Sequence, residues 1–379
     1  MVPVDATLTS RLHVPYTDFP AQFEAERGEI LEAVERVCRT GHFVLGRDVE
    51  AFEQEFAAFC GVQYAVGVAS GTDALLLAFR ALDIGSGDEV ITVPNSWISS
   101  TSSIVLVGAR PVFVDVCDDF TLDPVRLEAA ISPRTKAILP VHLTGRCADM
   151  DAIGAIAKRH GLHIVEDAAQ AVGARWKGQA AGSFGAVGCF SLHPLKNLSG
   201  IGDGGVVVTN DPTLAERVRL LRNHGLRTRD EVVLWGLNSR LDTLQAAVLR
   251  GRLRRLGEIT EARRRNAARY RAALSSVVQC PVDRPEAYAI YHLFMIQCDR
   301  RDALKGFLSA RGIDTKIHYP IPIHLQPCSR SLGYRPGDLP VTEAQSQRIL
   351  SLPIHQQLTS EQIDYVSQTI REFYQGDAR

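Results

Sequence analysis

The chain has 379 residues, of which 45% are hydrophobic and 22% are charged, a globular composition too long for one small domain. Its 42 basic and 43 acidic residues leave a formal charge of −1, which argues against a nucleic-acid partner and favours a small molecule. The sequence has no apolar run that could cross a membrane and no secretory leader at Met1-Val-Pro-Val-Asp5, so we expect a cytoplasmic protein. Eight scattered cysteines without a C-x-x-C pair argue against disulfides and zinc, and we expect no metal.

Between Tyr64 and Thr209, short apolar runs rich in β-branched residues alternate with helical patterns. This alternation predicts an α/β fold with a doubly wound sheet. Runs such as Ala137–Val141 are apolar on both faces, so the sheet should be mostly parallel and buried under helices. Strands are expected at Tyr64–Val68, Glu89–Val93, Pro111–Val116, Lys136–Val141, His163–Glu166, Gly188–Leu192 and Gly205–Thr209.

The first predicted strand is followed by Ser70-Gly71-Thr72-Asp73 and then by a helical run. Free backbone N–H groups and a hydroxyl at a helix N-terminus can hold a phosphate group, although an ordinary Ser or Thr cap has the same sequence. Trp97 lies in the loop after the second strand, where its ring could stack on a flat cofactor. A buried core position is the commoner role for tryptophan.

Glu166-Asp167-Ala-Ala-Gln170 ends another predicted strand. On its own, this pattern favours Asp167 as the N-cap of a following helix. The alternative is a carboxylate that keeps the pyridine nitrogen of pyridoxal phosphate protonated, so that the ring can accept electrons from a substrate carbanion.

Lys196 lies between a strand end and the glycine-rich segment Gly200–Gly205, at the sheet edge where α/β proteins bind ligands. The chain has only six lysines, and only lysine forms an imine with a carbonyl group, although a surface lysine on a loop is an equal alternative from position alone. The glycines do not match G-x-G-x-x-G and precede a strand, so they predict a tight turn rather than the nicotinamide site of an oxidoreductase.

A long helical stretch from Asp242 to Ser276, interrupted by Gly251 and Gly257, is expected to connect two domains, residues 1–245 and 246–379. Its arginines at 250–271 are interpreted as a solvated helix face, with nucleic acid or a sugar diphosphate as alternatives. The remainder is expected to form a smaller α+β domain that includes this helix. Its elements would be strands at His292–Gln297 and Lys316–Tyr319 and a last helix capped by Thr359 and Gln362.

Taken in order, these segments resemble the DegT-type nucleotide-sugar aminotransferases over nearly the whole chain. The resemblance implies the type I fold of pyridoxal-phosphate (PLP) transferases and PLP, or its pyridoxamine form, as the cofactor. It also rests on Gly41-His-Phe-Val-Leu-Gly46, Phe52-Glu-Gln-Glu-Phe56, Pro140-Val-His-Leu-Thr-Gly145, Asn223-His-Gly225 and Gly236-Leu-Asn-Ser-Arg240.

The resemblance also implies residue roles. Lys196 would be the catalytic residue and would carry the cofactor as a Schiff base. Asp167 would bind the pyridine nitrogen, Gln170 would lie at the hydroxyl side of the ring, and Trp97 would stack on its face.

At the other end of the cofactor, Gly71, Thr72 and Ser191 would hold the phosphate. Asn238 resembles the residue that reaches the phosphate of the neighbouring subunit's cofactor, which implies a homodimer with shared active sites. Tyr319 and His324 resemble a loop near the substrate.

The implied activity is transfer of an amino group from glutamate or glutamine to a keto-sugar in amino-sugar biosynthesis. Asp203 stands where many 4-amino-sugar enzymes have glutamate, which favours a nucleotide-linked 3-keto (6-deoxy)hexose. The same chemistry on a 4-keto sugar, a cyclitol ketone or a sugar aldehyde stays open, as does a PLP-binding sensor without catalysis. Dehydratases of this type carry histidine in place of the imine lysine, so Lys196 argues against dehydration.

Overall fold

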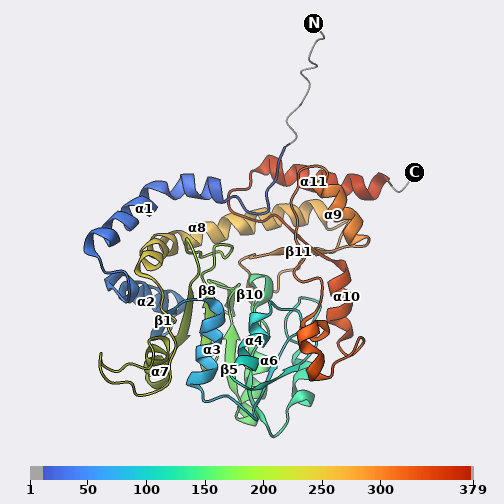
Figure 1. Ribbon diagram of the computed structural model, residues 1–379. Coiled ribbons are helices and arrows are strands. Elements are labelled where there is room, and N and C mark those ends of the chain that lie inside the picture. The colour runs from blue at the N-terminus through green and yellow to red at the C-terminus, as the bar shows by residue number, and fades with distance from the viewer. Residues whose placement is uncertain (1–11, 377–379) are drawn as a thin grey trace.

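The computed structural model describes residues 12–376 and has an α/β architecture (Figure 1). A central sheet of seven strands has the order β1-β9-β8-β5-β4-β2-β3, in which β9 runs antiparallel to both of its neighbours and all other pairs are parallel. The strands are β1 (Tyr64–Val68), β2 (Glu89–Thr92), β3 (Arg110–Phe113), β4 (Thr135–Ile138), β5 (His163–Asp167), β8 (Val187–Ser191) and β9 (Gly205–Thr209). The predicted sheet is confirmed, and each of the seven strands predicted for it overlaps an observed one.

Two layers of helices cover this sheet, because alternate strand residues point to opposite faces. Val66 and Val68 of β1 pack with α3 (Gly71–Ala81), α4 (Ser99–Leu106) and α7 (Pro212–Arg222). Ala65 belongs to the opposite layer, with α2 (Arg47–Cys60) and α6 (Met150–His160). The strands are therefore buried on both sides, as their apolar runs predict. Outside these layers lies α1 (Phe19–Thr40), whereas the short helix α5 (Pro124–Leu127) adds Leu127 to the layer of α2 and α6.

The connecting helix α8 (Thr243–Leu274) is continuous through Gly251 and Gly257, so the predicted interruptions are wrong. Packing of its buried side offsets the low helix propensity of glycine. Its first half packs against α1 and α2, and its last turns join a second core with β11 (Phe294–Gln297), β12 (Ile349–Leu352), α9 (Arg301–Ser309) and α11 (Ser360–Gln375).

Two sequence expectations in this second region have different outcomes. The capping box of Thr359 and Gln362 opens α11, as predicted. The expected strand Lys316–Tyr319 is wrong: among these residues only Lys316 forms a bridge, with Ser351. A small third sheet is made of β6 (Arg175–Trp176), β7 (Gln179–Ala180) and β10 (Ala287–Tyr288).

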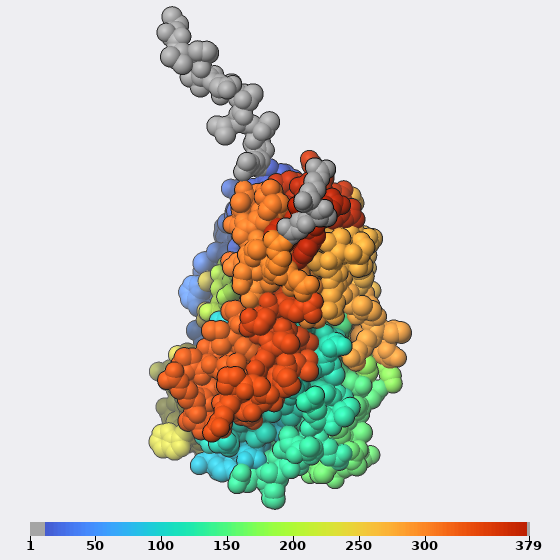
Figure 2. All heavy atoms as spheres, turned by 90° about the vertical axis from the view of Figure 1, so that its right-hand side faces the viewer, coloured from blue at the N-terminus to red at the C-terminus, as the bar shows by residue number. Residues whose placement is uncertain are grey.

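The C-terminal part also reaches back over the edge of the large sheet. In Figure 2 the segment around α10 (Pro340–Arg348) lies against the part of the chain around residues 110–120. The carboxylate of Asp115 accepts hydrogen bonds from the backbone N–H groups of Val341 and Thr342 at 2.8 and 2.9 Å. This contact anchors the segment beside the carboxyl ends of the strands. The domain boundary at residues 245 and 246 stays a prediction. Within residues 12–376, the helices are too short or too polar for any of them to span a bilayer.

Candidate active site

Asp167, the last residue of β5, is 5% exposed and faces the carboxyl edge of the sheet. Its Oδ1 accepts a hydrogen bond from the backbone N–H of Ala169 at 3.1 Å, but a turn rather than a helix follows. The helix-cap interpretation of Asp167 is therefore wrong. The carboxylate instead stabilises a tight turn, which lets the chain pass from β5 along the site.

The second oxygen of Asp167 is held by a chain of hydroxyl groups that the sequence analysis missed. Ser100 Oγ donates to Asp167 Oδ2 at 2.6 Å, and Ser96 Oγ lies 2.7 Å from Ser100 Oγ. Because the single hydroxyl proton of Ser100 goes to the carboxylate, Ser96 must donate to Ser100. Both serines are buried. Their spacing of four residues around a helix start was the only signal in the sequence.

The N-terminus of α3 forms the concave surface expected for a phosphate. Ser70 caps the helix by accepting the N–H of Asp73 at 3.0 Å. A Cβ atom placed on Gly71 would lie 2.7 Å from the Cβ of Ser191, so only glycine allows the start of α3 and the end of β8 to approach this closely. The structure thus brings Gly71, Thr72 and Ser191 together, and Thr72 Oγ1 is 2.7 Å from Ser99 Oγ.

Trp97 is 59% exposed rather than buried in the core, contrary to the commoner role of tryptophan. Its ring centroid lies 5.7 Å from that of Tyr319. Burial raises the pKa of the Tyr319 phenol, and the nearby Asp167 carboxylate adds to this rise. Tyr319 also contacts the side chain of Gln170, whose Oε1 accepts the N–H of Thr144 at 3.0 Å. Asp167, Gln170, Trp97 and Tyr319 therefore form one cluster of neighbouring side chains.

Lys196 follows β8, the parallel neighbour of β5, and is partly buried. Its backbone N–H bonds to the carbonyl of His193 at 2.8 Å, which closes a turn at the strand end. Burial lowers the pKa of the Lys196 amine to about 8, and the carboxylate of Asp167 opposes this shift. The structure thus places the amine within electrostatic reach of Asp167, in an environment that favours the neutral form.

Asn238 and His324 have different environments in the structure. Asn238 is exposed, whereas its neighbour Ser239 is buried and donates to Asp73 Oδ2 at 2.7 Å. His324 is 2% exposed, and its Nε2 is 3.1 Å from Glu343 Oε1. Its loop is fixed near Trp97 because the N–H of Ile323 bonds to the carbonyl of Pro94 at 2.8 Å. The roles expected of both residues stay predictions.

The interpretation of the arginines of α8 as a solvated face needs correction. Arg252 and Arg263 are 6% and 7% exposed. They are eleven residues apart, about three helical turns, so they share one side of the helix. Arg250 is also engaged, with both Asp48 and Glu55.

The geometry fits PLP on several independent observations. The approach of Gly71 to Ser191 leaves backbone groups for a phosphate, the Trp97 ring has an open face, and Asp167 is a fixed buried acceptor. Lys196, with its lowered pKa, lies within electrostatic reach of Asp167. Together these residues can hold a flat, phosphorylated ring that carries an electrophilic carbon.

Comparison with known sequences gives a consistent result. The sequence model of the DegT/DnrJ/EryC1/StrS aminotransferase family matches residues 24–371 of this chain. A dTDP-3-amino-3,4,6-trideoxy-alpha-D-glucose transaminase of Streptomyces venezuelae is 48% identical over 95% of this chain and 96% of its own. A UDP-N-acetyl-3-dehydro-alpha-D-glucosamine 3-aminotransferase of Acidithiobacillus ferrooxidans is 44% identical over 97% of this chain and 100% of its own.

Solved structures agree with the sequences. DesV of S. venezuelae, crystallised in complex with a ketimine intermediate, superposes with a TM-score of 0.93 at 48% identity and covers 95% of this chain and 98% of its own. NtdA of Bacillus subtilis, with bound cofactor PMP, has a TM-score of 0.89 at 30% identity and covers 96% of this chain and 85% of its own.

Proposed function

Because this chain belongs to the DegT/DnrJ/EryC1/StrS aminotransferase family, we propose that it is a PLP-dependent transaminase of a nucleotide-linked keto-sugar, with Lys196 as its catalytic residue. One observation carries the assignment of the site: Asp167 ends β5, Lys196 follows the neighbouring parallel strand β8, and the two groups act on each other electrostatically. When bound there, PLP would withdraw electrons from the carbon that bears the transferred amino group.

Each residue of the site would have a separate role in this reaction. Asp167 Oδ1 would accept a hydrogen bond from the protonated ring nitrogen and so keep the proton on that nitrogen, while Oδ2 stays engaged with Ser100. Trp97 and Gln170 would fix the plane of the ring, and Gly71, Thr72 and Ser191 would bind its phosphate.

The amine of Lys196 would take a proton from the donor carbon and return it to the cofactor. A pKa of about 8 leaves part of the amine neutral near neutral pH, as a general base requires.

For the acceptor, we propose a nucleotide-linked hexose with a keto group at carbon 3. Support comes from the names of the relatives at 48% and 44% identity, both of which specify amino transfer at carbon 3. The exposed residue Asp203, in the turn that leads into β9, is consistent with this branch. Tyr319, whose ring lies beside that of Trp97, would contact the sugar. Glutamate or glutamine would be the donor.

We further propose a homodimer with shared active sites. Phe43, Val44 and Ile201 are each about half exposed, and all three lie beside the start of α8. Exposed apolar patches of this kind mark protein interfaces. The exposed Asn238 would then reach the phosphate of the partner's cofactor.

Subunit complementation tests this arrangement. Lys196→Ala and Asn238→Asp homodimers should both be weak, whereas mixing them under exchange should restore activity, because one site per heterodimer is intact. No restoration would contradict shared sites.

The absorption spectrum tests the activity itself. The protein reconstituted with PLP should show a band near roughly 410 to 430 nm that shifts toward roughly 330 nm with excess L-glutamate or L-glutamine. A protein that acquires no band would refute the proposed function. A band that neither amino acid moves would favour a sensor instead.

A further inference from the structure

Among residues 12–376, five arginine side chains are buried, and four of them are paired with carboxylates. Arg222 pairs with Glu53, and Arg252 with Glu26 at 2.8 Å. Arg301 lies 2.6 Å from Asp302. Such pairing is expected because an isolated buried charge is costly.

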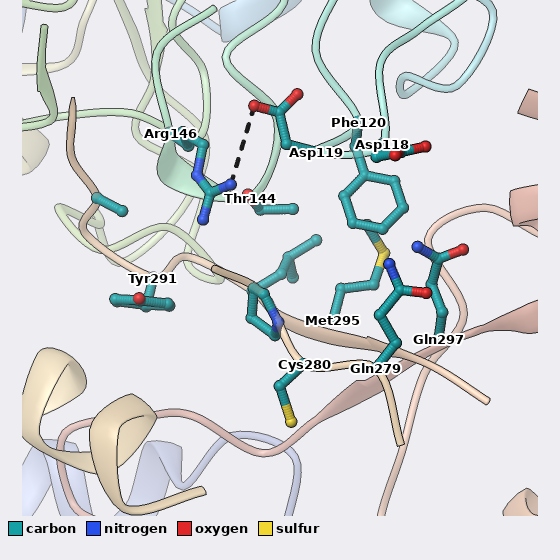
Figure 3. A pocket seen from close by; sticks show the side chains of 13 residues that line it. Asp118, Asp119, Phe120, Thr144, Arg146, Gln279, Cys280, Tyr291, Met295 and Gln297 are labelled. Atoms are coloured by element: carbon teal, nitrogen blue, oxygen red, sulfur yellow. Dashed lines mark ion pairs between the residues drawn. The ribbon is translucent and has the colours of Figure 1, made fainter. Parts of the chain in front are cut away.

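Arg146 is the fourth paired arginine, and it lines a cavity between two loops (Figure 3). It lies 3.9 Å from Asp119 and 3.8 Å from Asp283, so its charge is balanced by the protein. The cavity of Figure 3 therefore has no excess positive charge to attract an anion.

Arg263 is the exception. Its Nη1 donates to the backbone carbonyls of Tyr291 and His292 at 3.2 and 3.4 Å, but no carboxylate in residues 12–376 lies within 4 Å of it. Its buried Nε has no partner among the same residues. Burial lowers the pKa of Arg263 only to about 10, so the guanidinium is charged at neutral pH. This buried cation thus lacks a counterion.

Arg263 lines a cavity of about 40 Å³. The other polar residues that line it are Tyr16, Thr17, His292, His318 and His355. The Tyr16 hydroxyl and His355 Nδ1 are buried without hydrogen-bond partners among the described residues. The space suits a carboxylate group or one or two water molecules. No acidic residue lines it.

The cavity adjoins the candidate active site through two shared walls. Leu195, next to Lys196, lines it, and His292 Nδ1 is 3.2 Å from Asn197 Oδ1 on the other side of the same lysine. His318, a second wall, precedes Tyr319 in the chain, and Lys196 helps to lower the pKa of both histidines. Neutral histidines leave Arg263 as the charge that a ligand would meet.

We propose that Arg263 binds a carboxylate of the amino-acid donor, in this cavity behind His292 and His318. The inference rests on the proposed transaminase function, because only that function brings an amino acid to Lys196. A carboxylate would supply the missing counterion and accept hydrogen bonds from the unpartnered Nε and the Tyr16 hydroxyl. The keto-sugar, which needs no carboxylate, would not use this cation.

Binding of glutarate, an unreactive dicarboxylate, to the PLP-loaded protein tests the proposal without turnover. Calorimetry should show glutarate affinity at least about tenfold weaker in Arg263→Met, since one charged hydrogen-bonding partner is lost. Arg265→Met removes the same charge from an exposed position of α8 and should stay within about twofold of wild type.

The half-reaction gives a second readout. In Arg263→Met, the concentration of L-glutamate that gives half the maximal rate of the spectral shift should rise about tenfold or more. Should Arg263→Met fail to fold, Arg263→Lys keeps the charge but loses the Nε donor, and should weaken glutarate less than Arg263→Gln. Unchanged glutarate affinity in folded Arg263 variants would overturn the proposal and leave the transaminase assignment intact. A wild-type protein that takes up no PLP would instead refute the function itself.

Discussion

Asp167 and Glu166, at the end of β5, form a wall of the candidate active site. The buried polar groups of this wall are hydrogen-bonded, whereas some of those in the cavity around Arg263 are not. At the wall, Asp167 is held by Ser100 and the Ala169 N–H, and the fully buried Glu166 accepts N–H groups of Gly182, Phe184 and Gly185. In the cavity, the Arg263 Nε has no partner among the described residues. The difference suggests that groups needed as fixed charges are preorganised, whereas groups that meet a transient ligand are left open.

The largest effect is expected from removal of the Lys196 amine, which lies within electrostatic reach of Asp167. Lys196→Ala should lower the rate of transamination by at least about a thousandfold, because both covalent attachment and proton transfer depend on the amine. Steady-state assays with glutamate would measure this. Lys305→Ala, at an exposed position of α9, is the matched control and should retain wild-type rates. A Lys196→Ala protein of normal activity would contradict the assignment.

The second-largest effect is expected for the carboxylate of Asp167. Asp167→Asn should slow the first half-reaction by about a hundredfold, since an amide cannot keep the ring nitrogen protonated as a carboxylate does. Stopped-flow absorbance with L-glutamate measures the rate. Equal rates in the variant and the wild type would show that the ring nitrogen does not depend on Asp167.

The hydroxyl chain behind the carboxylate should have a smaller effect. Ser100→Ala removes one hydrogen bond to Asp167 and should weaken PLP binding by about tenfold. Fluorescence titration of the cofactor-free protein would give the dissociation constant. Ser102→Ala, on the same helix but without a contact to Asp167, should bind PLP like the wild type. Equal losses in both variants would indicate a general weakening of α4 rather than positioning of Asp167.

The smallest effect concerns the protonation state of the Lys196 amine. Burial disfavours the charged amine, so in the cofactor-free protein Lys196 should lose its proton with a midpoint near pH 8, and the neutral form should predominate above that pH. NMR of ¹³C-methylated lysines would follow each amine, and a free lysine side chain has an ordinary pKa of about 10.4. A midpoint for Lys196 close to this ordinary value would mean that the site does not tune the amine.

The sequence predicts the wall far better than the cavity. Strands such as β1 and β9 were found with their observed bounds, because strands that are buried on both faces have uninterrupted apolar runs. The expected helix after Asp167 was wrong because an aspartate stabilises a turn by the same local hydrogen bond. Lys316–Tyr319 failed as a strand because it meets β12 at a single bridge.

The partners of the site residues required tertiary structure. Ser100 meets Asp167 across 67 positions of the sequence, and nothing local to either residue indicates the contact. Arg263 was grouped with solvated arginines because charge patterning does not separate exposed from buried cations. The helical spacing that it shares with Arg252, Tyr270 and Leu274, all on the buried side of α8, was the available signal.

The most direct test of the central claim is to locate the cofactor on the chain. The PLP-loaded protein would be reduced with borohydride, digested and analysed by mass spectrometry. The account predicts a pyridoxyl group on the peptide that contains Lys196, lost when L-glutamate is added before reduction. Modification of any of the other five lysines, or of none, would contradict it.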